Sequence, residues 1–180
     1  MLTITVPAAE SFDPITETFY SIKEQKLQLE HSLLSVAKWE SKWNKPFLDR
    51  YTEKTLEETR DYIRCMTITQ NVDPTVYYAL TEDNYNKIAE YMQAPMTATW
   101  FKNDNKPPSR EILTAEVIYY YMVALQIPFT CEKWHLNRLM TLIRVCSEKN
   151  KPPKKMSKRS IMSRNQALNQ MRRARSGSMG

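Results

Sequence analysis

Glycine is almost absent from this 180-residue chain. The only two, Gly177 and Gly180, stand near its end, so the rest of the chain has none. A phosphate-binding P-loop, a dinucleotide-binding turn and a nucleophile elbow all need glycine where the backbone turns sharply or approaches a ligand. The sequence therefore argues against these enzyme classes and predicts few tight hairpins.

Long apolar runs are missing too. The longest, residues 117–125, is far shorter than the roughly 20 residues that cross a bilayer, so we expect no membrane partner. The N-terminus lacks the basic start and long apolar stretch of a signal peptide. Cys65, Cys131 and Cys146 are an odd number without paired spacing, which predicts free thiols in a reducing compartment.

Acidic residues are missing from residues 149–180, which carry ten Lys and Arg. Residues 1–148 hold all 20 Asp and Glu and the remaining 16 of the 26 Lys and Arg. A body of about −4 is thus joined to a tail of about +10, and like charges at this density oppose compaction. We predict an N-terminal strand and arm (1–26), a mainly helical globular domain (27–148) and a basic, proline-interrupted tail with a short helix (149–180).

Alternating apolar residues predict two strands. Leu2, Ile4 and Val6 alternate with threonine, and residues 26–31 alternate again. Residues 8–20 show no such pattern, which predicts an irregular arm. Residues 97–101 could form a third strand, followed by a loop at 103–108.

Cap residues predict where helices begin. Ser32 starts a helix that runs to Trp43, and Thr55 with Glu58 fits a capping box for a helix to about residue 66. The helix at 115–126 is apolar on nearly all sides, so we expect it to be buried on most of them. The fold class is mainly α: a single helical domain with a minor β element of two or three short strands and a basic C-terminal helical tail. Further helices are expected at 74–80, 81–92, 132–148 and 160–175.

No set of side chains predicts catalysis, a metal site or a cofactor. Cys131 and His135 lie one helical turn apart with Cys146 beyond, but zinc usually needs four ligands with short paired spacings. Buried cysteines are common as small hydrophobic residues. His31 and His135 are the only histidines, and neither has a nucleophile and an orienting group that the sequence can name. We therefore expect that the protein is not an enzyme.

Large aromatic residues are abundant by comparison. Trp39, Trp43, Trp100, Trp134 and the tyrosines at 119–121 could stack on nucleic-acid bases or serve as core and protein-interface anchors. The acidic body that carries them would repel phosphate, which favours the second interpretation. Residues 115–148 also match a helix-turn-helix in topology, but the connection lacks the usual glycine, and a plain helical hairpin fits better.

The basic tail has two interpretations. Basic, proline-interrupted extensions often contact nucleic acid without sequence specificity. The predicted tail helix also carries Ile161, Ala167, Leu168 and Met171, an apolar face that a purely electrostatic arm does not need. A segment that docks onto an acidic, partly apolar protein groove fits both properties.

Three segments of this sequence together resemble the tail assembly chaperones of long-tailed bacteriophages. They are LEHSLLS at 29–35 leading into KWESKW at 38–43, CEKWHLNRL at 131–139, and the ending that runs from ALN at 167–169 through Arg172 and Arg173 to Gly180. The resemblance covers most of residues 27–180. It implies a non-enzymatic protein, without a cofactor, that coats the long helical tape measure protein, keeps it soluble and helps recruit the tail tube protein.

The resemblance identifies no catalytic residue. A homo-oligomer is left open, and the protein would act in the host cytoplasm during phage assembly. The candidate partner-binding residues lie both in the body and in the basic tail. They are Trp39, Trp43, Trp134, His135, Lys154, Lys155, Lys158, Arg159, Arg164, Leu168, Arg172 and Arg173.

Two alternatives remain. The chain could be a structural component of the virion, at the neck or tail, whose N-terminal arm and tail thread between subunits. It could instead bind nucleic acid through residues 149–180, in which case affinity should fall steeply with salt.

Overall fold

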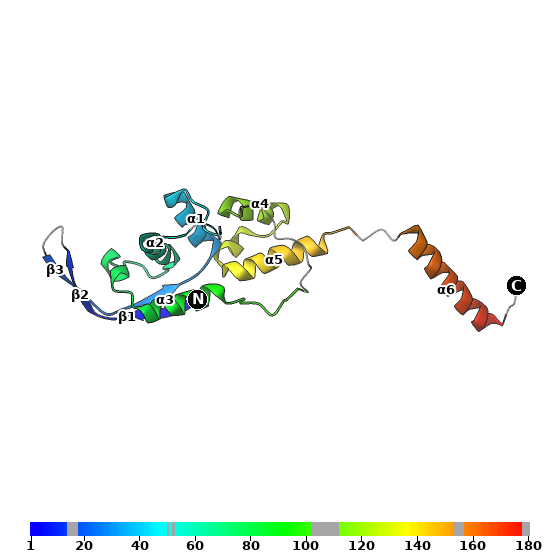
Figure 1. Ribbon diagram of the computed structural model, residues 1–180, viewed down its shortest axis with the longest axis horizontal. Helices are drawn as coiled ribbons and strands as arrows, with labels where there is room; N and C mark the ends of the chain where they lie inside the picture. The colour runs from blue at the N-terminus through cyan, green and yellow to red at the C-terminus, as the bar shows by residue number, and fades with distance from the viewer. Residues whose placement is uncertain (14–17, 50, 52, 102–111, 153–156, 178–180) are drawn as a thin grey trace. The chain divides into compact units, whose positions relative to one another are not determined.

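The computed structural model describes residues 1–13, 18–49, 51, 53–101, 112–152 and 157–177 (Figure 1). The chain divides into two compact units, Met1–Glu148 and Lys149–Gly180. The fold is mainly helical, with a small antiparallel β element and a C-terminal helix. Residues 1–26 belong to the first unit together with the helices that follow.

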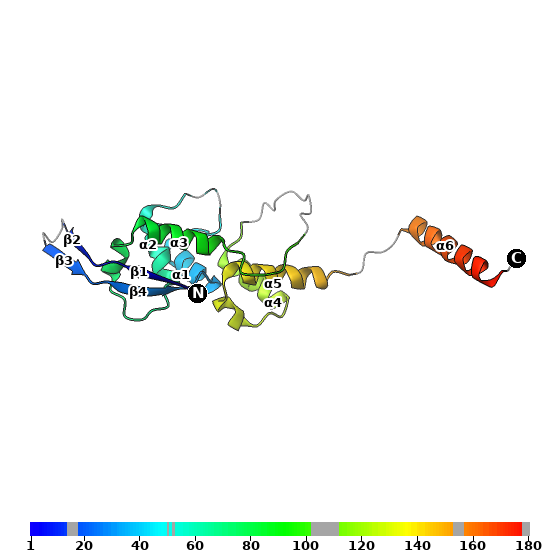
Figure 2. The same ribbon diagram turned by 90° about the horizontal axis from the view of Figure 1, so that it is seen from below.

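The β element is one long hairpin. Strand β1 (Leu2–Val6) pairs antiparallel with β4 (Gln25–Leu29), and β2 (Ala9–Asp13) pairs with β3 (Thr18–Ile22). Both ladders keep one register, so β2 and β3 continue β1 and β4 outward (Figure 2). Pro7 stands between the two ladders and has no N–H to donate, which accounts for the interruption.

The expectation of an irregular arm at 8–20 is therefore wrong where the structure describes it. Residues 9–13 read AESFD, a polar segment without the apolar alternation that marks a half-buried strand. Pairing with β3 supplies the backbone hydrogen bonds of this strand. Such pairing leaves no signal in the pattern of apolar residues. The two strands expected at 2–6 and 26–31 are confirmed, the second as Gln25–Leu29.

Helices α1 (Leu33–Trp43) and α2 (Leu56–Met66) pack on each other and begin at the expected caps. The Ser32 hydroxyl accepts a hydrogen bond from the Ser35 N–H at 3.3 Å. Thr55 and Glu58 form the full capping box, each side chain accepting from the other's backbone N–H. These local signals fix where the two helices start, and their apolar faces then meet in the core.

The remaining helices of the first unit complete this core. They are the 3-10 helix η1 (Pro74–Tyr78), α3 (Glu82–Gln93), α4 (Ala115–Ala124), the 3-10 helix η2 (Phe129–Lys133) and α5 (Leu136–Lys149). Helix α3 lies along β1, where the Asn84 side chain donates to the Thr5 carbonyl at 3.1 Å. The largest fully buried side chains include Trp39, Leu27, Leu33, Ile118 and Met122.

Three expectations differ from the structure. Residues 97–101 form no strand. The helix expected at 132–148 begins only at Leu136, because residues 129–133 form η2 and His135 makes a β-bridge to Ser32. Helix α4 is not buried on most sides, since Tyr120 is 67% and Val123 60% exposed. The loop expected at 103–108 lies outside the described residues.

The second unit contains α6 (Lys158–Ser176). Ser157 caps its start by accepting from the Ser160 N–H at 3.1 Å. Gly177 ends it with a φ of 62°, in the left-handed region that glycine adopts without steric cost. None of its described residues is buried.

Candidate functional site

The four body residues expected at a partner surface do not share one. Trp39 is fully buried and donates from Nε1 to the Glu58 carbonyl at 2.8 Å, and His135 is 6% exposed. Both are core residues, which corrects their placement on a binding surface. Trp43 is half-buried and donates to the Asp61 carboxylate at 2.9 Å. Trp134 is the most accessible of the four, 36% exposed, with the Arg138 guanidinium 4.3 Å from its ring centre.

The tail residues of the expected surface lie on α6 where the structure describes them. Lys154 and Lys155 fall outside the described residues. The others are all solvent-exposed: Lys158, Arg159, Arg164, Leu168, Arg172 and Arg173. Leu168 is 41% exposed and Ile161 is 44% exposed. The surface of this basic helix therefore also presents apolar side chains.

The two histidines, far apart in sequence, meet in the core. The centres of the His31 and His135 rings are 5.3 Å apart, at 71° to each other. The Leu136 N–H donates to the His31 carbonyl at 2.7 Å, which joins the start of α5 to the segment between β4 and α1. Nothing local in the sequence links residues 31 and 135, so only the tertiary arrangement could show this pair.

Hydrogen bonds hold both rings in place. His31 Nδ1 lies 2.5 Å from the Tyr62 hydroxyl. The Asn137 N–H donates to His135 Nδ1 at 3.3 Å, so Nδ1 is the acceptor, and His135 Nε2 carries the proton that reaches the Tyr91 carbonyl at 3.0 Å. Each ring thus has at least one hydrogen-bond partner that suits a neutral imidazole.

Burial keeps this pair uncharged. Removal from water, with a smaller contribution from the nearby His135, lowers the pKa of His31 from 6.5 to about 4. Burial also lowers the pKa of His135, against the hydrogen bond to Tyr91 and the charge of Glu30, which raise it. Two neutral, hydrogen-bonded rings act as structural residues and not as a proton-transferring pair.

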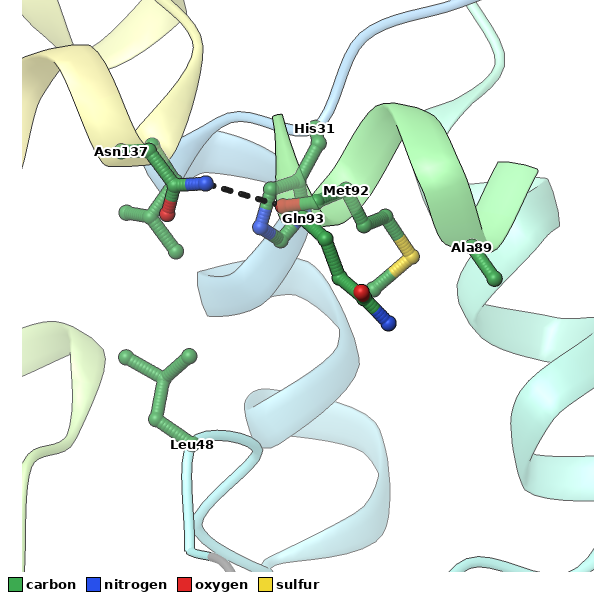
Figure 3. A pocket seen from close by; sticks show the side chains of 7 residues that line it. His31, Leu48, Ala89, Met92, Gln93 and Asn137 are labelled. Carbon is green, nitrogen blue, oxygen red and sulfur yellow. Dashed lines mark hydrogen bonds between the residues drawn. The ribbon is translucent and has the colours of Figure 1, made fainter. Parts of the chain in front are cut away.

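A pocket of about 490 Å³ opens beside His31 (Figure 3). The Asn137 amide nitrogen donates to the Met92 and Ala94 carbonyls at 2.9 and 2.8 Å, so its donors are already used. The lining is otherwise mostly apolar and includes no carboxylate or nucleophile: His31, Leu48, Ala89, Met92, Gln93, Leu136 and Asn137. This pocket offers a ligand one imidazole face and little else.

Metal ligands do not gather in the part of the chain that the structure describes. No group of three or more His, Cys, Asp or Glu side chains there could hold a metal ion. Cys131 is buried, and Cys65 and Cys146 are partly buried. Burial raises the pKa of the Cys65 thiol, which disfavours the reactive thiolate.

The most distinctive surface of the first unit is a groove between α4 and α5, here named the α4–α5 groove. Its volume is about 610 Å³. The two helices lie next to each other in both overall views (Figures 1 and 2). The lining is chiefly apolar and aromatic: Phe101, Tyr120, Tyr121, Ala124, Leu125, Met140, Thr141, Ile143, Arg144 and Ser147.

Helix α5 lines the groove with residues that lie next to its core face, and Ile143 belongs to both. Leu139 and Ile143 are buried, whereas Met140, Thr141 and Arg144 follow the helical spacing i, i+1, i+4 along the groove. The Arg144 guanidinium lies 4.0 Å from the centre of the Phe101 ring. Sequence reasoning missed this surface, although the second helical face of α5 was a readable signal.

The groove continues into the outer face of α4. Val123, which is 60% exposed, lies one helical turn from the lining residue Tyr120, which is 67% exposed, and so extends the apolar surface beyond the groove lining. Single exposed apolar residues are ordinary, but a contiguous apolar patch marks an interaction surface.

The described helices include none that is long and apolar enough to cross a membrane. Comparisons with protein-family models, with curated proteins and with solved structures found no match to this chain.

Proposed function

We propose that this protein is a non-enzymatic tail assembly chaperone of a bacteriophage, which holds the tape measure protein soluble and helps the tail tube protein assemble around it. The proposal combines the sequence resemblance with one structural observation, the α4–α5 groove. Its lining includes three aromatic residues, a methionine and an arginine, residue types that are enriched at protein interfaces.

The physical need of such a partner fits this surface. A long helical protein with exposed apolar stripes aggregates unless those stripes are covered. A groove that already presents apolar and aromatic side chains to solvent can cover a stripe without first unfolding. The exposed bases of α6 add a second, electrostatic contact to acidic parts of the same assembly. The chaperone would work in the host cytoplasm while the phage assembles.

Co-expression with a tape measure protein of the same phage tests the proposal. We expect a soluble, stoichiometric complex that survives purification with the wild type. Tyr120→Ala combined with Val123→Ser should lose it, because both side chains contribute exposed apolar surface. Tyr51→Ala is the matched control, since Tyr51 is 96% exposed and does not line the groove. A tape measure protein that stays insoluble beside the wild type would refute the function.

The exposed bases of α6 favour nucleic-acid binding as a second candidate function. A chain truncated after Glu148 lacks them all. If the intact chain binds DNA with a steep salt dependence and the truncated chain does not, the tail is a nucleic-acid arm. Mass spectrometry of purified phage particles separates a chaperone, which is absent from them, from a structural component, which is present.

A further inference from the structure

We propose that the α4–α5 groove binds one amphipathic helix of the protein partner, and that Arg144 selects a helix with a carboxylate beside its apolar stripe. The inference rests on the proposed function for one point only, the identity of the protein that supplies this helix. Its chemistry, however, follows from the groove alone.

The lining fixes the character of the occupant. Apolar and aromatic side chains form both walls: Tyr120, Tyr121, Ala124 and Leu125 from α4, and Met140 and Ile143 from α5. Arg144 is the single charged residue among the lining residues. An occupant must therefore present an apolar surface with one negative charge to be complementary.

The extent of the apolar surface indicates a helix and not a small molecule. The groove runs between two helices, and Val123, one helical turn from the wall residue Tyr120, continues its apolar surface onto the outer face of α4. A drug-sized ligand would be largely enclosed by its site, whereas this surface is open and extended. A helix laid into such a groove buries side chains at i, i+3, i+4 and i+7, the spacing of an amphipathic stripe.

The setting of Arg144 suits carboxylate binding. Its guanidinium lies 4.0 Å from the centre of the Phe101 ring, within the range of a cation–π contact. The in-plane N–H groups of a guanidinium form a fork that matches a carboxylate with two parallel hydrogen bonds, and the contact with the ring helps to position that fork. Arg144 is itself exposed, and a helix bound against the apolar walls would exclude water from part of the ion pair, which strengthens it.

Nucleic acid is the weaker occupant for this groove. A nucleic-acid site needs several cations along the path of the phosphates, and the groove supplies one. The residues around it belong to a body in which acids outnumber bases, 20 to 16.

Two fluorescent synthetic helical peptides test the inference with the full-length chain. Both carry leucine at i, i+3, i+4 and i+7; one has glutamate beside this stripe and the other has lysine at the same position. We expect the wild type to bind the glutamate peptide roughly fivefold more tightly, the range of a partly exposed, partly desolvated ion pair. Arg144→Glu should reverse the preference, and Arg144→Gln should abolish it.

Arg138→Glu is the matched control, because Arg138 is an exposed arginine of the same helix that does not line the groove. It should keep the preference of the wild type. Tyr120→Ala should weaken both peptides to the same degree, since it removes apolar surface and no charge. Thermal unfolding of each variant verifies that it folds.

Equal affinity of the wild type for the two peptides, or no binding of either, overturns the inference. So does equal loss of preference in Arg138→Glu, or a groove that is closed by a second copy, seen as a dimer that Tyr120→Ala dissociates. None of these outcomes determines whether the tape measure protein forms a soluble complex in the co-expression experiment. A tape measure complex that forms equally well with Arg144→Glu refutes the selection of an acidic helix and leaves the chaperone function standing.

Discussion

Acidification should destabilise the first unit through His31. The ring is 4% exposed and is held by Tyr62 in the folded chain, whereas in the unfolded chain it is free to take up a proton. The folded pKa of about 4 lies below the unfolded value of 6.5, so the unfolded state binds more protons between these two values. The stabilisation is therefore complete above pH 6.5 and is lost as the pH falls towards 4.

The size of this loss follows from the pKa difference. A lowering of about 2.5 units, at 1.36 kcal/mol per unit, corresponds to about 3 kcal/mol in the free energy of unfolding. That is a large part of the roughly 5–15 kcal/mol by which domains are stable. His135 acts in the same direction, because its pKa is also lowered by burial.

Carboxyl groups titrate in the same pH range, so the wild type alone cannot isolate His31. Burial raises the pKa of Glu40, which makes stability fall as the pH rises through its folded value, opposite to His31. The comparison with His31→Asn removes these shared contributions, since asparagine does not titrate and approximates the position of Nδ1. The cavity left by the smaller side chain costs the same at every pH.

Urea unfolding followed by tryptophan fluorescence, at several pH values from 7.5 to 4, measures this difference. We expect the stability advantage of the wild type over His31→Asn to shrink by about 3 kcal/mol across that range. A difference that stays constant to within about 0.5 kcal/mol would refute the reasoning, and would mean that His31 is hydrated or charged in the folded protein.

Three further predictions concern stability. Glu40→Gln should lower the free energy of unfolding by about 2 kcal/mol in urea titrations. The two oxygens of the buried carboxylate accept from the Phe47 and Ala115 N–H groups at 2.7 Å each, whereas an amide has only one oxygen. An unchanged midpoint would contradict this. Thr55→Ala should cost about 1 kcal/mol through loss of the N-cap of α2, whereas Thr55→Ser should cost much less, and equal losses would point to another cause. Truncation after Glu148 should leave the melting temperature of the first unit within about 1 °C, since α6 has no buried residue among those described; a clear drop in differential scanning calorimetry would show that the tail stabilises the body.

Helix starts could be predicted from sequence because their signals are local. Ser32, Thr55, Thr81 and Thr114 each cap a helix through a backbone N–H three residues further on. Such a cap depends only on residues within one helical turn, so no tertiary contact is needed to predict it. The mainly helical fold class and the two strands at the ends of the hairpin followed from equally local patterns.

The outer hairpin and the exposure of α4 could not be predicted, for a shared reason. Whether Ala9–Asp13 becomes a strand depends on the presence of β3 and not on its own polarity pattern. Whether an apolar face of α4 is covered depends on which helices reach it, and none of the described helices covers Tyr120 or Val123. Composition says that such side chains are apolar, while topology decides which of them meet solvent.

The candidate groove shows the same limit. Neither Arg144 nor Phe101 belongs to a recognisable sequence motif. The two residues are far apart in sequence, and only the tertiary fold brings them into contact. The tryptophans drew attention as anchors by their size, yet Trp39 proved to be the centre of the core. A large aromatic residue predicts burial somewhere, and sequence alone does not say whether its partner is the same chain or another.

The hydrogen bond from the Leu136 N–H to the His31 carbonyl also has a consequence for synthesis. Leu136 leaves the ribosome about a hundred residues after His31, which at about 5–20 residues per second is a wait of roughly 5–20 s. During that time α1 lacks its contacts with η2, and the ring of His31 lacks the His135 ring beside it. Until residue 136 has been made, the nascent chain thus exposes apolar surface that the finished fold covers.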